Sequence, residues 1–156
     1  MGWRMKTAEA GFRFPVLAFT SDLEIWGFQD LDRLTKCGPR TLKEGIQIGM
    51  ELVDADLQRW RVLAVRRTGR AGSLLSLFLP FGPPQARIEH ELQAMAAISI
   101  EDARLRAIRA MEAHISDYLD GDDREAEFEP LLASVKRARS IEEIFDLLQP
   151  DTFEPH

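Results

Sequence analysis

The chain has 156 residues, of which 45% are hydrophobic and 29% are charged, and its formal net charge is −6. This length suits one domain, and this composition is typical of a globular protein and argues against a disordered one. The single cysteine excludes an internal disulfide framework and a cysteine-built zinc site, and three histidines give little basis for a histidine-built metal site. We therefore expect a single domain over residues 1–156, with no metal and no cofactor.

No segment of the chain predicts insertion into a membrane. The longest run without a formal charge, residues 71–86, contains three prolines and is shorter than the roughly 20 apolar residues that a spanning helix needs. Near the N-terminus, Glu9 and Arg13 interrupt any apolar stretch of the kind found in signal peptides. We expect no membrane contact and a cytoplasmic location.

The first part of the chain has the patterns of β-strands. Residues 12–19 are apolar on both faces, and residues 23–28 form a second short run. The turn-forming residues between these runs predict a hairpin. Residues 29–37 favour a short helix, because Leu31 and Leu34 share a face, and the Gly38-Pro39 pair that follows is a stop signal.

Four later stretches also predict strands. Residues 46–52 alternate, with Ile46 and Ile48 on the apolar face, and residues 60–65 alternate as the second arm of a hairpin. Residues 74–79 are continuously apolar, which is typical of a central strand. Residues 87–93 again alternate between a mostly apolar face and a polar face.

After residue 98 the period of the apolar pattern changes from 2 to 3.6. Three amphipathic stripes follow, at residues 100–119, 128–138 and 141–148, and the first and third begin after Ser99 and Ser140 as in capping boxes. The sequence therefore predicts the α+β class. We expect an antiparallel sheet of five or six strands over residues 12–94, followed by three C-terminal helices packed on one face.

Charge is distributed unequally along the chain. Residues 99–156 contain fifteen acidic and seven basic residues, whereas residues 1–98 contain eleven and thirteen. The acidic excess could be a solvated surface, or it could be a docking patch, since concentrated charge speeds association and excludes wrong partners. A loop rich in carboxylates could also bind calcium, but the spacing of an EF-hand loop is absent. The candidate partner-binding residues are Asp117, Asp120, Asp122, Asp123 and Glu125.

A second group of charges consists of five arginines around the strand at residues 59–70. Such a group can bind phosphates or nucleic acid, with Trp60 available for stacking. However, Trp60 has the parity of the core residues Val62 and Ala64, and the whole chain is acidic. We therefore expect no nucleic-acid partner and interpret these arginines as solvent-facing.

No pattern predicts a catalytic residue. The pair His90-Glu91 begins like a zincin motif, but Ala94 stands where the second histidine would be needed. His90 shares a face with apolar neighbours, which favours a structural role. Cys37 lies at the end of a predicted helix, where the dipole disfavours a thiolate. An enzyme is therefore not favoured, but a small enzyme or ligand-binding domain with a pocket between sheet and helices stays open as the alternative.

The order of several segments carries a resemblance. These segments are Phe14-Pro-Val-Leu17, Asp22-Leu-Glu-Ile-Trp26, Leu52-Val-Asp-Ala-Asp56, Trp60-Arg-Val62, Ser99-Ile-Glu-Asp102 and Val135-Lys-Arg-Ala-Arg-Ser-Ile-Glu-Glu-Ile144. In this order the chain resembles small uncharacterised bacterial proteins, some of which are similar to immunity proteins encoded beside secreted toxins. The resemblance implies a non-enzymatic cytoplasmic protein that binds and blocks one cognate toxin, and it carries over no functional residue.

Our leading hypothesis from the sequence is therefore a protein-binding module. Its acidic surface would face a basic protein partner, such as a toxin domain. The sequence leaves the oligomeric state open.

Overall fold

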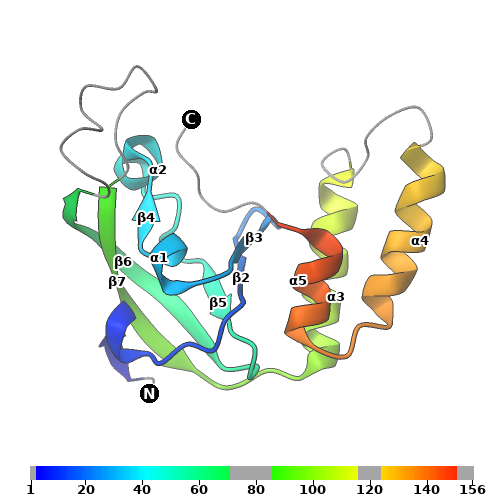
Figure 1. Cartoon of the computed structure of the whole chain (residues 1–156), viewed down its shortest axis with the longest axis horizontal. Helices are drawn as coiled ribbons and strands as arrows, with labels where there is room; N and C mark the ends of the chain where they lie inside the picture. Colours follow the sequence, from blue (N-terminus) through cyan, green and yellow to red (C-terminus); the bar gives the residue numbers. More distant parts are fainter. Residues whose placement is uncertain (1–2, 71–85, 116–123, 151–156) are drawn as a thin grey trace.

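A computed structural model describes residues 3–70, 86–115 and 124–150 of the chain. Within these ranges the fold contains an open antiparallel sheet and five α-helices. The sheet, with two short helices beside it, lies next to the three C-terminal helices (Figure 1). The predicted α+β class is confirmed.

The described part of the chain places seven strands in one sheet, in the order β1-β7-β6-β5-β2-β3, and β4 also pairs with β7. All of these pairings are antiparallel. The predicted hairpin at residues 12–28 is confirmed as β2 and β3. The sheet also includes β1, which precedes the predicted range. The strands are β1 (Arg4–Lys6), β2 (Val16–Phe19), β3 (Ile25–Phe28), β4 (Lys36–Cys37), β5 (Glu51–Val53), β6 (Arg59–Arg70) and β7 (Ala86–Met95).

Two of the helices that follow the sheet, α3 and α5, begin where the predicted serine caps place them. The hydroxyl oxygens of Ser99 and Ser140 accept hydrogen bonds from the backbone N–H groups of Asp102 and Glu143, each at 3.1 Å. These caps satisfy donors that the first helical turn leaves unpaired. The helices are η1 (Thr7–Glu9, 3₁₀), α1 (Leu31–Leu34), α2 (Pro39–Glu44), α3 (Ile100–Ala113), α4 (Arg124–Lys136) and α5 (Ile141–Leu148).

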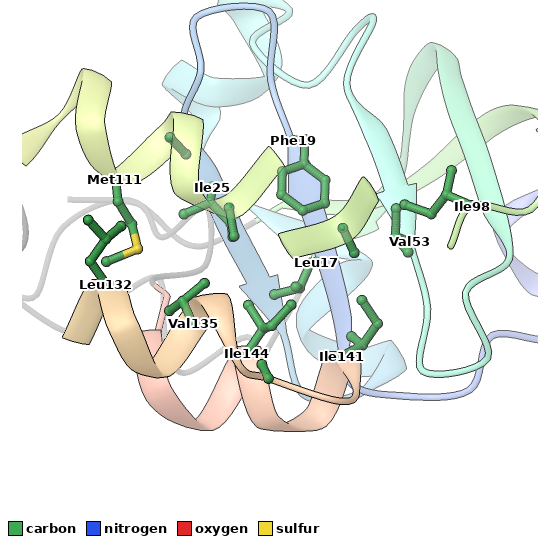
Figure 2. Packing of buried hydrophobic residues seen from close by; sticks show 14 of the residues in the cluster. Leu17, Phe19, Ile25, Val53, Ile98, Met111, Leu132, Val135, Ile141 and Ile144 are labelled. Carbon is green, nitrogen blue, oxygen red and sulfur yellow. The ribbon is translucent and has the colours of Figure 1, made fainter. Parts of the chain in front are cut away.

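Side chains of β2 point alternately into two cores. Leu17 and Phe19, with Val53 of β5, contribute to a buried cluster that includes residues of α3, α4 and α5. Figure 2 shows this cluster, in which the labelled helical residues are Met111, Leu132, Val135, Ile141 and Ile144.

The second core lies on the opposite face of the sheet. Val16 and Ala18 of β2 are buried there with Trp60 and Val62 of β6 and with Leu92 of β7. Because both faces of β2 are covered, the continuously apolar pattern of this strand is explained.

The structure corrects the predicted strand at residues 46–52. Only Glu51–Val53 forms a strand. Met50 and Leu52 are buried as the alternation predicts, but Ile46 and Ile48 are 40% and 54% exposed and Gln47 is 2% exposed, so the prediction is wrong for residues 46–48. The cause lies in the preceding residues, because α2 ends at Gly45 in the left-handed region and the chain then turns again at Gly49.

The predicted helix over residues 29–37 is also shorter in the structure. Asp30 caps α1, which ends at Leu34, and Lys36 and Cys37 then pair with β7 as strand β4. Pairing with β7 buries the Cys37 side chain completely, which a continued surface helix would not do. The strand predicted at residues 74–79 lies outside the described residues.

Contact between β3 and α5 leads to a stability prediction. A Cβ atom added at Gly27 would lie 2.4 Å from Cγ of Pro150 and 2.7 Å from Cε2 of Phe145. We expect Gly27→Ala to lower the free energy of unfolding by roughly 1–3 kcal/mol, because overpacking forces the neighbouring rings to move. Denaturant unfolding measures this loss. The control is Gly69→Ala in β6, where a Cβ would meet no atom within 4 Å; equal stability losses in both variants would contradict the prediction.

Candidate functional site

The partner-binding residues predicted from the sequence are not placed by the structure. Asp117, Asp120, Asp122 and Asp123 lie outside the described residues. Glu125 belongs to α4 by its backbone, but its side chain is not described.

A pocket of about 290 Å³ lies where the β2–β3 hairpin and the start of β5 meet α3. Its lining combines an apolar part, from Phe19, Leu23 and Ala110, with the two guanidinium groups of Arg106 and Arg109. We call it the α3 pocket. It lies between sheet and helix, where the alternative hypothesis from the sequence places a ligand site.

Glu51 forms the charged wall of the α3 pocket. Its side chain is 15% exposed, and its carboxylate oxygens accept from Arg59 Nη1 at 3.4 Å, from Arg61 Nη2 at 3.5 Å and from Arg106 Nη1. Arg61 is the cross-strand partner of Glu51, and Arg59 lies two residues before it on the same face of β6. Arg106 comes from α3, so this network joins the sheet to the helix.

Two opposing effects set the pKa of the Glu51 carboxyl. Burial raises this pKa, because it disfavours the charged form. The hydrogen bond from Arg106 and the charges of Arg106, Arg59 and Arg61 outweigh burial and lower the pKa below its ordinary value. Glu51 is therefore a carboxylate at neutral pH and is held as the acceptor of three arginines.

The remaining polar side chains of the α3 pocket differ in their partners. Glu24 accepts a hydrogen bond from Nε1 of Trp26 at 3.1 Å. Arg106 is held over the ring of Phe19, 5.9 Å from its centroid, in a cation–π arrangement. Arg109 is exposed and forms no ion pair with any residue in the described part of the chain. The guanidinium group of Arg109 is thus available to bind an anion.

A larger hollow of about 410 Å³ lies beside β1, and its charges are already paired. Arg4 is 3.6 Å from Glu91, and Glu89 is 3.9 Å from Lys6 and 2.7 Å from Arg66. These groups compensate one another, so every cation that lines this hollow has an ion pair, whereas Arg109 has none among the described residues. We therefore consider the smaller α3 pocket the better candidate.

His90 also borders the hollow beside β1, but its ring is fully buried on the opposite side of the strand. The backbone N–H of His90 donates to Thr7 Oγ1 at 2.6 Å, and this hydroxyl is 3.1 Å from Nδ1 of the ring. Nε2 is 2.7 Å from Oε1 of Gln47. Ile88 and Leu92 are buried on the same face, so the predicted structural role of His90 agrees with its surroundings.

This set of hydrogen bonds fits a neutral ring that donates from Nε2 and accepts at Nδ1. Burial lowers the pKa of His90 to about 4, because a charged imidazolium would lose its hydration. His90 is therefore neutral at physiological pH, and its role is structural rather than part of a binding or catalytic site.

The other sequence candidates have structural explanations. Trp60 is buried and its ring centroid lies 4.5 Å from that of Phe12, so it is not available to stack on a base. Arg59 and Arg61 bind Glu51 instead of only facing solvent. Cys37 is buried, and burial raises the pKa of its thiol to about 11, which disfavours the reactive thiolate.

Comparison with family models, with curated proteins and with solved structures gives no match to this chain. Among the described residues, no cluster of three or more histidine, cysteine or carboxylate groups has an arrangement that could hold a metal ion. No described helix is both long enough and apolar enough to cross a membrane.

Burial of His90 predicts a pH-dependent stability. The folded-state pKa of about 4 is below the unfolded value of 6.5, so the unfolded chain takes up a proton first as the pH falls. We expect the free energy of unfolding to fall by about 3 kcal/mol between pH 6.5 and pH 4 from this group alone.

Denaturant unfolding at a series of pH values measures the effect. His90→Gln should flatten the fall in stability between pH 6.5 and pH 4, because glutamine does not titrate. The matched control is His114→Gln, which removes a histidine that lies outside the Thr7–His90–Gln47 hydrogen bonds. Parallel pH profiles for the wild type and His90→Gln would contradict the assignment.

Proposed function

We propose that the protein binds a small anion in the α3 pocket. The observation that carries this proposal is a surplus of guanidinium groups. At and around the pocket there are four guanidinium groups and two carboxylates. Arg59, Arg61 and Arg106 surround Glu51, whereas Arg109 and Glu24 line the pocket without an ion pair among the described residues. An anion placed beside Arg109 and Arg106 would reduce this imbalance.

The pocket is suited to anion binding because part of it is held in advance. Arg106 is fixed by its hydrogen bond to Glu51 and by its contact with the ring of Phe19. A guanidinium held in one orientation loses less conformational entropy when a ligand binds, and its planar fork matches a carboxylate or a phosphate. The hydroxyl groups of Thr20 and Ser21 lie in the same lining and can donate to anion oxygens.

The chemistry of the lining supports binding rather than catalysis. Its described residues include neither histidine nor cysteine. Both carboxylates already accept hydrogen bonds, Glu24 from Trp26 and Glu51 from Arg106. Since Glu51 is held ionised by three arginines, it is a weak proton acceptor, and a general base would need a higher pKa.

Two substitutions should change the affinity of the pocket for anions in opposite directions. We expect Arg109→Gln to weaken the binding of benzoate and of inorganic phosphate by roughly tenfold or more, since a charged hydrogen bond contributes about 1.5–3 kcal/mol. The stability of the Arg109→Gln variant should not change, because Arg109 is exposed. Glu51→Gln should strengthen anion binding and lower stability, because it removes the acceptor of three arginines.

Isothermal titration calorimetry with both anions measures these affinities. The matched control is Arg137→Gln, which removes an exposed arginine that does not line the pocket. An absence of anion binding to the wild type, or equal losses in Arg109→Gln and Arg137→Gln, would refute the proposed function.

A second proposed function is the protein-binding module that the sequence suggests, with an immunity protein for a bacterial toxin as its most specific form. Exposed carboxylates on α4 and α5 favour it, and none of them forms an ion pair with a described residue. Unpaired acidic groups attract a basic protein surface and speed association. These carboxylates are Glu127, Glu129, Glu142, Glu143 and Asp146.

Neutralising Asp120, Asp122 and Asp123 together tests this second function. With a basic partner in hand, such as a toxin domain encoded by a neighbouring gene, we expect slower association and a weaker dependence on salt, at unchanged thermal stability. Surface plasmon resonance at several salt concentrations measures both. A control that neutralises Glu9, Asp56 and Glu91 should bind like the wild type. Association rates that stay unchanged at low salt would identify the acidic segment as solvated surface only.

A further inference from the structure

We infer that the anion bound in the α3 pocket carries an apolar group, and that the ligand is a carboxylate with a short aliphatic chain or a single aromatic ring. This inference rests on the proposed function and adds the class of ligand to it. Its basis is that charged and apolar groups lie side by side in one small pocket.

The apolar side of the α3 pocket comes from both the hairpin and the helix. Phe19 and Ala110 line it and are 8% and 1% exposed, so they form a wall that belongs to the core behind it. Leu23 lines the pocket from the hairpin turn and is 47% exposed. A ligand that covers Leu23 would remove apolar surface from water, and this favours an apolar group on the ligand.

Leu23 is held in an unfavourable backbone conformation. Its φ is +60°, in the left-handed region, where a leucine costs about 1 kcal/mol or more relative to glycine. The turn fixes this conformation, because Leu23 N–H donates to Thr20 O at 3.2 Å and Thr20 N–H donates to Glu24 O at 3.0 Å. Glycine or asparagine would suit this position better.

Leu57 has the same type of backbone strain as Leu23 but lies in a different environment. Leu57 also has a positive φ, of 65°, but its side chain packs against the core between the sheet and the helices. Core packing offsets the backbone strain at Leu57. The half-exposed side chain of Leu23 lacks that degree of burial in the free protein. A ligand that packs against Leu23 would supply the missing contact.

The charged side of the pocket lies directly beside this apolar wall. Phe19 and Glu51 are cross-strand partners, and Arg106 contacts both of them. Arg109, three residues further along α3, is the lining cation that forms no ion pair with a described carboxylate. One such guanidinium matches one negative charge, and its fork binds both oxygens of a carboxylate.

The size of the α3 pocket limits the apolar group. Pockets for small organic ligands commonly span about 300–1,000 Å³, and the volume of about 290 Å³ is just below this range. The pocket can therefore take a chain of a few carbons or one ring. Longer chains would extend into solvent and gain little further affinity.

A series of linear carboxylates tests the inference. Acetate, butanoate, hexanoate and decanoate are titrated into the protein by calorimetry, with 1-hexanol and inorganic phosphate as comparison ligands. We expect affinity to rise two- to fourfold per methylene up to about hexanoate and then to level off, because a buried methylene contributes up to about fourfold. Hexanol should bind at least tenfold more weakly than hexanoate.

The variant Leu23→Asn separates the apolar contact from the charged one. It should reduce the rise in affinity from acetate to hexanoate, leave the affinity for acetate and phosphate unchanged, and keep or raise the melting temperature. The control is Leu31→Asn on α1, which removes a leucine of similar exposure that does not line the pocket. Equal effects of the two variants on hexanoate would overturn the inference.

The outcomes distinguish this inference from the proposed function. If acetate and phosphate bind through Arg109 but chain length has no effect, the pocket binds anions and the inference fails. If hexanol binds as tightly as hexanoate, the site is apolar only and the inference also fails. If none of the anions binds, the proposed function itself fails.

Discussion

The carboxylate of Glu51 is the interaction on which the arrangement of sheet and helices depends. A largely buried carboxylate destabilises a fold unless charged or polar partners replace its lost hydration. Here Arg59 and Arg61 supply two partners from the neighbouring strand, and Arg106 supplies a third from α3. Because these partners come from separate elements, satisfying one carboxylate also sets how α3 lies against the sheet.

The same constraint shapes the α3 pocket. Residues of β2 contribute to the cores on both faces of the sheet, so the hairpin that follows this strand is anchored at its base. Arg106 contacts Phe19 of β2 as well as Glu51, and the hairpin turn carries Leu23 to the edge of the pocket. Fixed apolar and cationic groups therefore lie together at one point, which is the property that selective binding of a small ligand requires.

A second buried polar group has a different role. His90, Thr7 and Gln47 form a chain of hydrogen bonds that links β7, the N-terminal 3₁₀ turn and the segment before β5. In this chain Nε2 of Gln47 has no hydrogen-bond partner among the described residues. Such a group is tolerated because the other donors and acceptors hold the three segments in place. This polar chain also explains why Gln47, and not its isoleucine neighbours, points inward.

Local patterns in the sequence were sufficient for the α+β class, the β2–β3 hairpin, the alternation around His90 and the helix starts at Ser99 and Ser140, because backbone periodicity and capping act over a few residues. Which side chains of residues 46–48 point inward was decided by the tertiary structure, since the burial of Gln47 depends on a histidine 43 residues away. The candidate site depended even more on the tertiary structure. Glu51 and Arg106 are 55 residues apart, and no local pattern shows that a carboxylate on a strand and an arginine on a distant helix will meet.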